Sequence, residues 1–111
     1  SEMSHDSAAI DRALELFQVL AHPIRLRLLL ALCGREECVC DLATRLDRPQ
    51  PYISQQLAEL RQAGLIADRR EGRRIFYRLT DACVCAVLAA TDLCTQRQAA
   101  EVRRDCLHHC A

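Results

Sequence analysis

The spacing of apolar residues changes twice along this chain, and the changes restrict the folds it can adopt. Up to about residue 63 apolar side chains recur every three or four positions, which is typical of helices that bury one face. Between 65 and 79 they alternate instead, with Ile75, Tyr77 and Leu79 on one side, which predicts a β-hairpin. From Thr80 the helical spacing resumes. The pattern predicts a mainly α fold with one small hairpin.

Four helices are expected before the hairpin, because proline or glycine interrupts the helical spacing at Pro23, Gly34, Pro49 and Gly64. They cover about 8–21, 24–33, 39–46 and 50–63. The last two are short and joined by a tight turn, which is the helix-turn-helix pattern, here at about 38–63. A hairpin at about 65–79, with its turn at Glu71–Gly72, completes a winged helix-turn-helix. A final helix is expected over about 80–108, so that residues 1–111 form a single domain.

Composition and charge agree with one globular domain. The 111 residues are 50% hydrophobic and 27% charged, which excludes a disordered chain. Arginines interrupt the most apolar stretch, so neither a membrane span nor a membrane partner is expected, and the charged first twenty residues do not resemble a secretory leader. The net charge is zero, but residues 45–78 hold eight arginines and four acids. A basic middle of this kind is typical of a nucleic-acid-binding face.

The helix expected at 50–63 has the features of a DNA-reading helix. Its apolar residues Ile53 and Leu57 face inward, which leaves a polar face without acids at its start. Glutamine pairs with adenine through two hydrogen bonds, and hydroxyls reach bases or phosphates. Arginines at the hairpin tip would contact phosphates or the minor groove. The candidate DNA-binding residues are Gln50, Tyr52, Ser54, Gln55, Arg73 and Arg74.

Several segments in this order resemble the ArsR/SmtB family of winged-helix repressors. They are His22-Pro23-Ile24-Arg25-Leu26-Arg27-Leu28-Leu29, Cys38-Val39-Cys40-Asp41-Leu42-Ala43, Ile53-Ser54-Gln55-Gln56-Leu57, Leu60-Arg61-Gln62-Ala63-Gly64-Leu65, Arg70-Glu71-Gly72-Arg73 and Tyr77-Arg78-Leu79. The resemblance implies a cytoplasmic repressor that binds double-stranded operator DNA as a homodimer and leaves it when a metal or metalloid binds. It also implies pairing through the first and last helices, at about 8–21 and 80–108.

Eight cysteines are present, which in a secreted peptide would indicate a disulfide framework. Here amphipathic helices can build the core unaided, so we expect reduced thiols in the cytoplasm rather than disulfides. Cys33 and Cys85 are interpreted as core residues.

Cys38 and Cys40 match the thiol-rich metal box of the resembled family. Residues i and i+2 point about 200° apart on a regular helix, so the pair can share an ion only at a helix start. The helix dipole there favours thiolate, and both sulfurs are expected to be accessible. We expect trivalent arsenic or antimony as inducer, with Cys106 or Cys110 near the C-terminus as third ligand.

A second group on the last helix consists of Asp81, Cys83 and Cys94, which align with ligand positions of zinc-type relatives. Arg97 replaces the final acid of that set, so an apolar helix interface is the favoured interpretation of these cysteines.

Other functions stay open at this stage. The same repressor could sense cadmium, lead or zinc, or a thiol-redox or sulfide signal. A thiol oxidoreductase would need a Cys-X-X-Cys motif, which is absent, and a metal chaperone would not need a basic wing. The sequence contains no catalytic triad or phosphate loop, so neither an enzyme nor an organic cofactor is expected.

Overall fold

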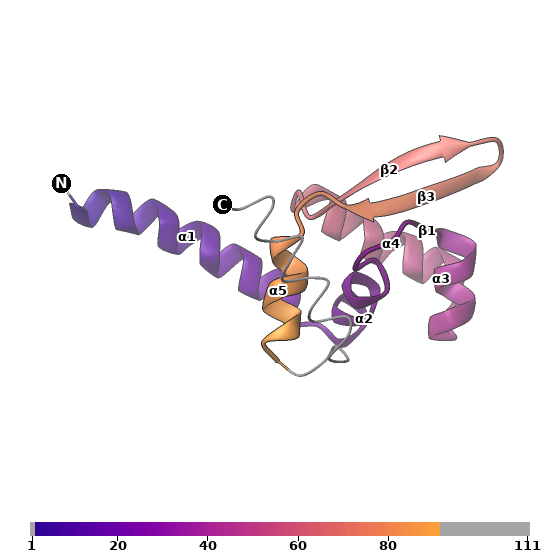
Figure 1. The fold of residues 1–111 in the computed structure, drawn as a ribbon, viewed down its shortest axis with the longest axis horizontal. Coiled ribbons are helices and arrows are strands. Elements are labelled where there is room, and N and C mark those ends of the chain that lie inside the picture. The colour runs from indigo at the N-terminus through magenta and orange to yellow at the C-terminus, as the bar shows by residue number, and fades with distance from the viewer. Residues whose placement is uncertain (1, 92–111) are drawn as a thin grey trace.

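The computed structural model describes residues 2–91 and is mainly helical, with one long hairpin (Figure 1). In chain order its elements are α1 (Glu2–Leu20), α2 (Pro23–Ala31), β1 (Glu37–Cys38), α3 (Val39–Leu46), α4 (Gln50–Gln62), β2 (Ile66–Glu71), β3 (Arg74–Leu79) and α5 (Cys83–Ala89). This confirms the expected winged-helix fold. The expected last helix is described only as far as α5, and residues 92–108 of that prediction lie outside the described part.

Local sequence sets where the helices begin and end. His22 is extended and its Nδ1 accepts a hydrogen bond from the Arg25 backbone N–H at 3.5 Å, which caps α2. Pro23 occupies the first turn of that helix, where its missing N–H costs no hydrogen bond. Asp47 ends α3 in the left-handed region at φ 54°, and Pro49 precedes α4. The tight turn between α3 and α4 follows from these two residues.

The wing is an antiparallel sheet whose strand order in the described residues is β1-β3-β2. Glu71 pairs with Arg74, so the turn consists of Gly72 and Arg73 and lies one residue later than the sequence predicted. Gly72 has φ 61°, the backbone region that a two-residue hairpin turn requires at its first position. The third strand, β1, was not predicted, because two residues are too few to show an alternation.

The core lies between α2, α3, α4 and α5, under the base of the sheet. Its fully buried side chains come from each of these helices, and α4 contributes one every three or four residues. They include Leu28, Leu29, Leu42, Ile53, Leu57, Leu60 and Leu88. This packing fixes α3 and α4 relative to each other and to the wing.

Helix α1 extends away from this core as an arm, at the end of the molecule opposite the hairpin tip (Figure 1). Ile10, Leu14 and Phe17 of this helix are 63%, 53% and 58% exposed. The described part of the chain therefore leaves an apolar helix face uncovered. No helix within residues 2–91 combines the length and the apolar character needed to cross a membrane.

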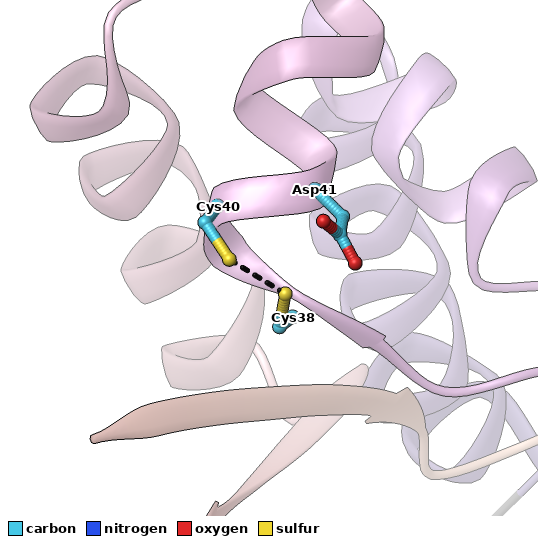
Figure 2. Close-up of side chains that lie close together, drawn as sticks. All are labelled: Cys38, Cys40 and Asp41. Carbon is cyan, nitrogen blue, oxygen red and sulfur yellow. Dashed lines mark hydrogen bonds between the residues drawn. The ribbon is translucent and has the colours of Figure 1, made fainter.

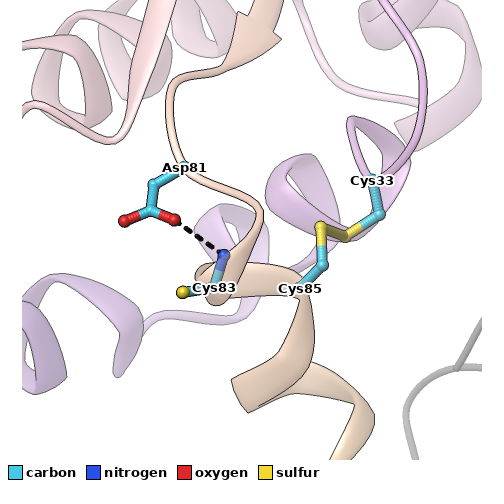
Figure 3. Close-up of a disulfide and its surroundings, with 4 residues drawn as sticks. All are labelled: Cys33, Asp81, Cys83 and Cys85. Carbon is cyan, nitrogen blue, oxygen red and sulfur yellow. Dashed lines mark hydrogen bonds between the residues drawn. A yellow bond between two sulfur atoms is a disulfide. The ribbon is translucent and has the colours of Figure 1, made fainter. Parts of the chain in front are cut away.

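The expectation that cysteines stay unpaired is wrong for Cys33 and Cys85, which form a disulfide with their Cα atoms 5.8 Å apart (Figure 3). Cys33 follows the C-terminal end of α2 and Cys85 lies in α5, and these two helices pack against each other. Cys85 is buried as expected, and Cys33 is half-buried. The two cysteines are 52 residues apart in the sequence, and the packing of α2 on α5 brings them together. The local sequence around each cysteine indicates burial but not this pairing.

Candidate metal centre and nucleic-acid interface

The Cys38 and Cys40 sulfurs lie 2.8 Å apart at the start of α3 (Figure 2). Cys38 ends β1 and has extended backbone, with φ −87° and ψ 156°, whereas Cys40 lies in the first turn of the helix. The extended residue cancels the divergence that two positions along a regular helix would impose. The strand-to-helix junction therefore brings both thiols to one point.

The two thiols differ in burial and acidity. Cys38 is 1% exposed, so the expectation that both sulfurs are accessible is wrong for this residue; Cys40 is half-buried. Burial raises the pKa of the Cys38 thiol. The hydrogen bond from Cys38 lowers the pKa of the Cys40 thiol, and the Arg74 guanidinium lowers it further. Cys40 is therefore the more acidic thiol of the pair and Cys38 the more buried one.

Asp41 adds an oxygen donor that the sequence interpretation did not include. One donor atom from each of Cys38, Cys40 and Asp41 can be chosen so that all lie within 4.8 Å of one another. The carboxylate stands beside the two sulfurs in Figure 2. The sequence signal for this donor was that Asp41 directly follows Cys40. Two sulfurs and one oxygen form a donor set for a soft or borderline ion.

Arg74, predicted as a DNA contact, lies against this cluster. Its Nη2 is 3.9 Å from Cys40 Sγ and 4.0 Å from Asp41 Oδ1. Arg74 is the first residue of β3, so the wing reaches the thiol pair through this side chain.

Within the described residues, no other predicted ligand joins this cluster. Cys106, Cys110 and Cys94 lie outside them. Asp81 accepts a hydrogen bond from the Cys83 backbone N–H at 2.9 Å, close to the Cys33–Cys85 disulfide (Figure 3).

The predicted DNA-reading residues lie on the outer face of α4. Gln50, Ser54 and Gln55 are exposed, and Tyr52 is half-buried. Gln56, the residue after Gln55, is buried and accepts a hydrogen bond from Arg25 Nε at 3.0 Å. The exposed polar groups of α4 thus point away from the core.

The wing arginines are of two kinds. Arg69 is bound by the Glu36 carboxylate, with a shortest contact of 2.7 Å, and also by Glu71. Its guanidinium stacks 4.7 Å from the Phe76 ring centroid. Arg70 and Arg73 are exposed and have no hydrogen bond or ion pair with any described residue. The hairpin tip thus keeps unpaired positive charge.

Comparison with known proteins identifies the family. The model of bacterial regulatory proteins of the arsR family matches residues 22–68. A biofilm growth-associated repressor of Xylella fastidiosa (strain Temecula1) is 40% identical over 87 residues, which cover 77% of this chain and 76% of that protein. The chain belongs to the arsR family. The arsenical resistance operon repressor of Escherichia coli (strain K12) is 48% identical to this arsR-family chain over 68 residues, 60% of the chain.

The match covers 58% of the Escherichia coli protein, so the chain spans less than two thirds of that relative. The crystal structure of the transcriptional repressor BigR from Xylella fastidiosa resembles this arsR-family chain with a TM-score of 0.72 and 35% identity. That likeness covers 86% of the chain and 99% of BigR. The arrangement of helices and wing is therefore that of a solved repressor.

Proposed function

We propose that this chain is a DNA-binding transcriptional repressor that leaves its operator when trivalent arsenic or antimony binds Cys38 and Cys40. The observation that carries the proposal is the 2.8 Å approach of the two sulfurs at the start of α3, the first helix of the DNA-binding pair. The name of the Escherichia coli relative, an arsenical resistance operon repressor, supports the choice of inducer. The cytoplasm, where operator DNA is found, is the proposed location, and no catalysis is involved.

The chemistry of the pair suits arsenite. Trivalent arsenic is a soft acceptor that prefers thiolate sulfur, and the Cys40 thiol has a lowered pKa. Each thiol that binds arsenous acid replaces one hydroxyl group, and its proton leaves with that hydroxyl as water. No electrons are transferred. We propose Cys106 or Cys110 as the source of a third sulfur.

The proposed DNA interface combines α4 with the wing tip. Helix α4 would enter the major groove, where the exposed Gln50, Ser54 and Gln55 face base edges and Tyr52 flanks them. Arg73 and Arg74 would neutralise phosphates beside it. Cys38 and Cys40 lie one helix away from this face, so a change at the start of α3 alters how α4 and the wing meet DNA.

We also propose that the repressor is a homodimer paired through α1 and the last helix. The exposed Ile10, Leu14 and Phe17 form an apolar face that a second copy would bury, and Val87 of α5 is also exposed, at 36%. Leu14→Glu should then lower the sedimentation coefficient from the value of a dimer to that of a monomer. Glu15→Gln, a change at the neighbouring position, should leave the dimer intact. A monomeric wild type at micromolar concentration contradicts the proposal.

The inducer is tested by fluorescence anisotropy of the reduced protein on a duplex from its own promoter, titrated in parallel with arsenite, Cd²⁺ and Zn²⁺. Release by about one arsenite per protein, together with no release of the Cys38→Ser, Cys40→Ser variant, supports the proposal. If that double variant responds like the wild type, the sensing site is elsewhere.

A divalent inducer is the second candidate, and the Asp41 carboxylate favours it. Zinc, cadmium and lead accept mixed sulfur and oxygen ligands, and three such donor atoms lie within 4.8 Å of one another here. Asp41→Asn separates the candidates, because it should weaken Cd²⁺ binding and leave arsenite binding unchanged. Absorption of the metal–thiolate bond provides the readout.

A redox or sulfide signal is the third candidate, and the Cys33–Cys85 disulfide favours it. Formation of this bond transfers two electrons and two protons from the thiols to an oxidant such as a peroxide. The bond joins α2 to α5, the helix we propose to lie in the dimer interface. The test is release from DNA by an oxidant. If this release is lost in Cys33→Ser and kept in the Cys38→Ser, Cys40→Ser variant, the redox signal is supported over a metal inducer.

A further inference from the structure

The thiol pair is connected to the wing as well as to α3. Cys38 pairs with Phe76 across the β1–β3 ladder. Cys40 accepts a contact from Arg74 Nη2 at 3.9 Å, and Asp41 attracts the same guanidinium at 4.0 Å. The backbone of Cys38 and the sulfur of Cys40 are thus joined to Phe76 and Arg74 of one strand, which begins directly after the hairpin turn.

Arg74 differs from its neighbours in this respect. Arg69 is bound to Glu36, which precedes β1, and to Glu71 of β2. Arg73, the adjacent residue, is exposed and has no bonded partner in the described part of the chain. Of the tip arginines 69, 70, 73 and 74, only Arg74 contacts a thiol within residues 2–91. Arg73 is its natural control.

We propose that Arg74 is the positioning residue that transmits occupancy of the Cys38–Cys40 site to the wing. The inference rests on the proposed function and adds a second route to the one through α3. In the ion-free protein Cys40 and Asp41 hold the guanidinium, which keeps the first residue of β3 against the start of α3. Helix α4 and the wing then approach DNA in a fixed relative position.

Arsenite binding removes this hold. Two As–O bonds break and two As–S bonds form, and the thiol protons leave with the hydroxyls as two waters. The electron pair that Cys40 offered to Arg74 then takes part in the new bond, so the sulfur becomes a poorer acceptor. The displacement of Cys38 passes to Phe76 through their strand pairing. The wing is released from α3, and its phosphate contacts no longer align with those of α4.

The test compares Arg74→Gln with Arg73→Gln on the full chain, by anisotropy on duplex DNA from its own promoter with and without sodium arsenite. Each variant loses one positive charge near the backbone phosphates, so both should bind ion-free DNA more weakly. In the wild type and in Arg73→Gln, arsenite should raise Kd by a similar factor, on the order of tens. In Arg74→Gln that factor should fall to a few-fold.

Arsenite occupancy is followed in the same samples through the ultraviolet absorption of the thiolate–arsenic bonds, and Arg74→Gln should still fill its site. A filled Arg74→Gln protein that keeps the full wild-type factor overturns the inference. A wild type that binds DNA and does not respond to arsenite instead overturns the proposed function, together with the coupling that rests on it.

A double-mutant cycle provides a measurement without arsenite. If Arg74 acts through Cys40, the effects of Cys40→Ser and Arg74→Gln on ion-free DNA affinity should be non-additive, whereas Cys40→Ser and Arg73→Gln should add. Additive effects in both pairs contradict the proposed link.

Discussion

Arg25 donates from Nε to the buried Oε1 of Gln56 at 3.0 Å, and this hydrogen bond joins α2 to the middle of α4. Arg25 also reaches the Val19 carbonyl at the end of α1, at 3.5 Å. One guanidinium thus contacts the proposed dimer helix and the proposed DNA-reading helix. Two adjacent glutamines of α4 therefore have different environments: Gln55 is exposed to solvent, whereas Gln56 is buried and hydrogen-bonded to Arg25.

The first prediction concerns this buried pair. Arg25→Met leaves the Gln56 oxygen buried without its donor, so the free energy of unfolding should fall by about 1–3 kcal/mol. Urea denaturation measures the change. Arg27→Met is the matched control, because Arg27 is exposed on the same helix and should change stability little. Adding Gln56→Met to Arg25→Met should recover part of the loss; a further loss would show that the hydrogen bond is not the cause.

The second prediction is a pH dependence of the wing. The Arg69 guanidinium holds the pKa of the Glu36 carboxyl below its ordinary value. A lowered carboxyl pKa stabilises the folded protein above the unfolded-state pKa, and this contribution is lost as pH falls through the lowered pKa. The difference in urea midpoint between wild type and Glu36→Gln should therefore be complete at neutral pH, begin to shrink near the ordinary carboxyl pKa of 4.5, and vanish once the pH lies below the lowered pKa.

The control for this pH dependence is Glu59→Gln, because the Glu59 side chain is exposed on α4 and has no hydrogen bond or ion pair with a described residue. Its difference from wild type should stay small throughout. A Glu36→Gln difference that is unchanged in acid would contradict the assigned ion pair.

Periodicity predicted the helices and the hairpin, because burial of one face dictates where apolar residues recur. The meeting of Cys38 and Cys40 also followed from local rules, since two sulfurs two positions apart can converge only where extended backbone becomes helix. The turn was misplaced by one residue, because Gly72 indicates a turn but not which position of the turn it occupies, and only the strand register decides this.

What the sequence did not predict depends on contacts between distant segments. Cys33 and Cys85 are 52 residues apart and meet because α2 packs on α5. Arg74 reaches Asp41 because β3 pairs with the two-residue strand β1, which is too short to leave a pattern. Gln56 is polar, as surface residues usually are, and the partner that allows its burial, Arg25, comes from another helix.

The third prediction concerns the reactivity of the two thiols. The Cys40 thiol has a lowered pKa and is half-exposed to solvent, whereas burial raises the pKa of Cys38. Iodoacetamide at neutral pH should therefore alkylate Cys40 several-fold faster than Cys38, as measured by mass spectrometry of peptides. Arg74→Gln should slow the reaction of Cys40, and Arg73→Gln should not. Equal rates for both cysteines would contradict the difference in burial and acidity between them.

The last prediction concerns the disulfide. A bond between residues 52 apart restricts the unfolded chain strongly, so its loss should lower the free energy of unfolding by about 4 kcal/mol. The Cys33→Ser, Cys85→Ser variant should show this loss in urea without reductant. Dithiothreitol should then bring the wild type close to the variant, because it opens the same bond. If the difference between the two proteins stays the same under reductant, the loss comes from packing at Cys85, which is 2% exposed, rather than from the bond.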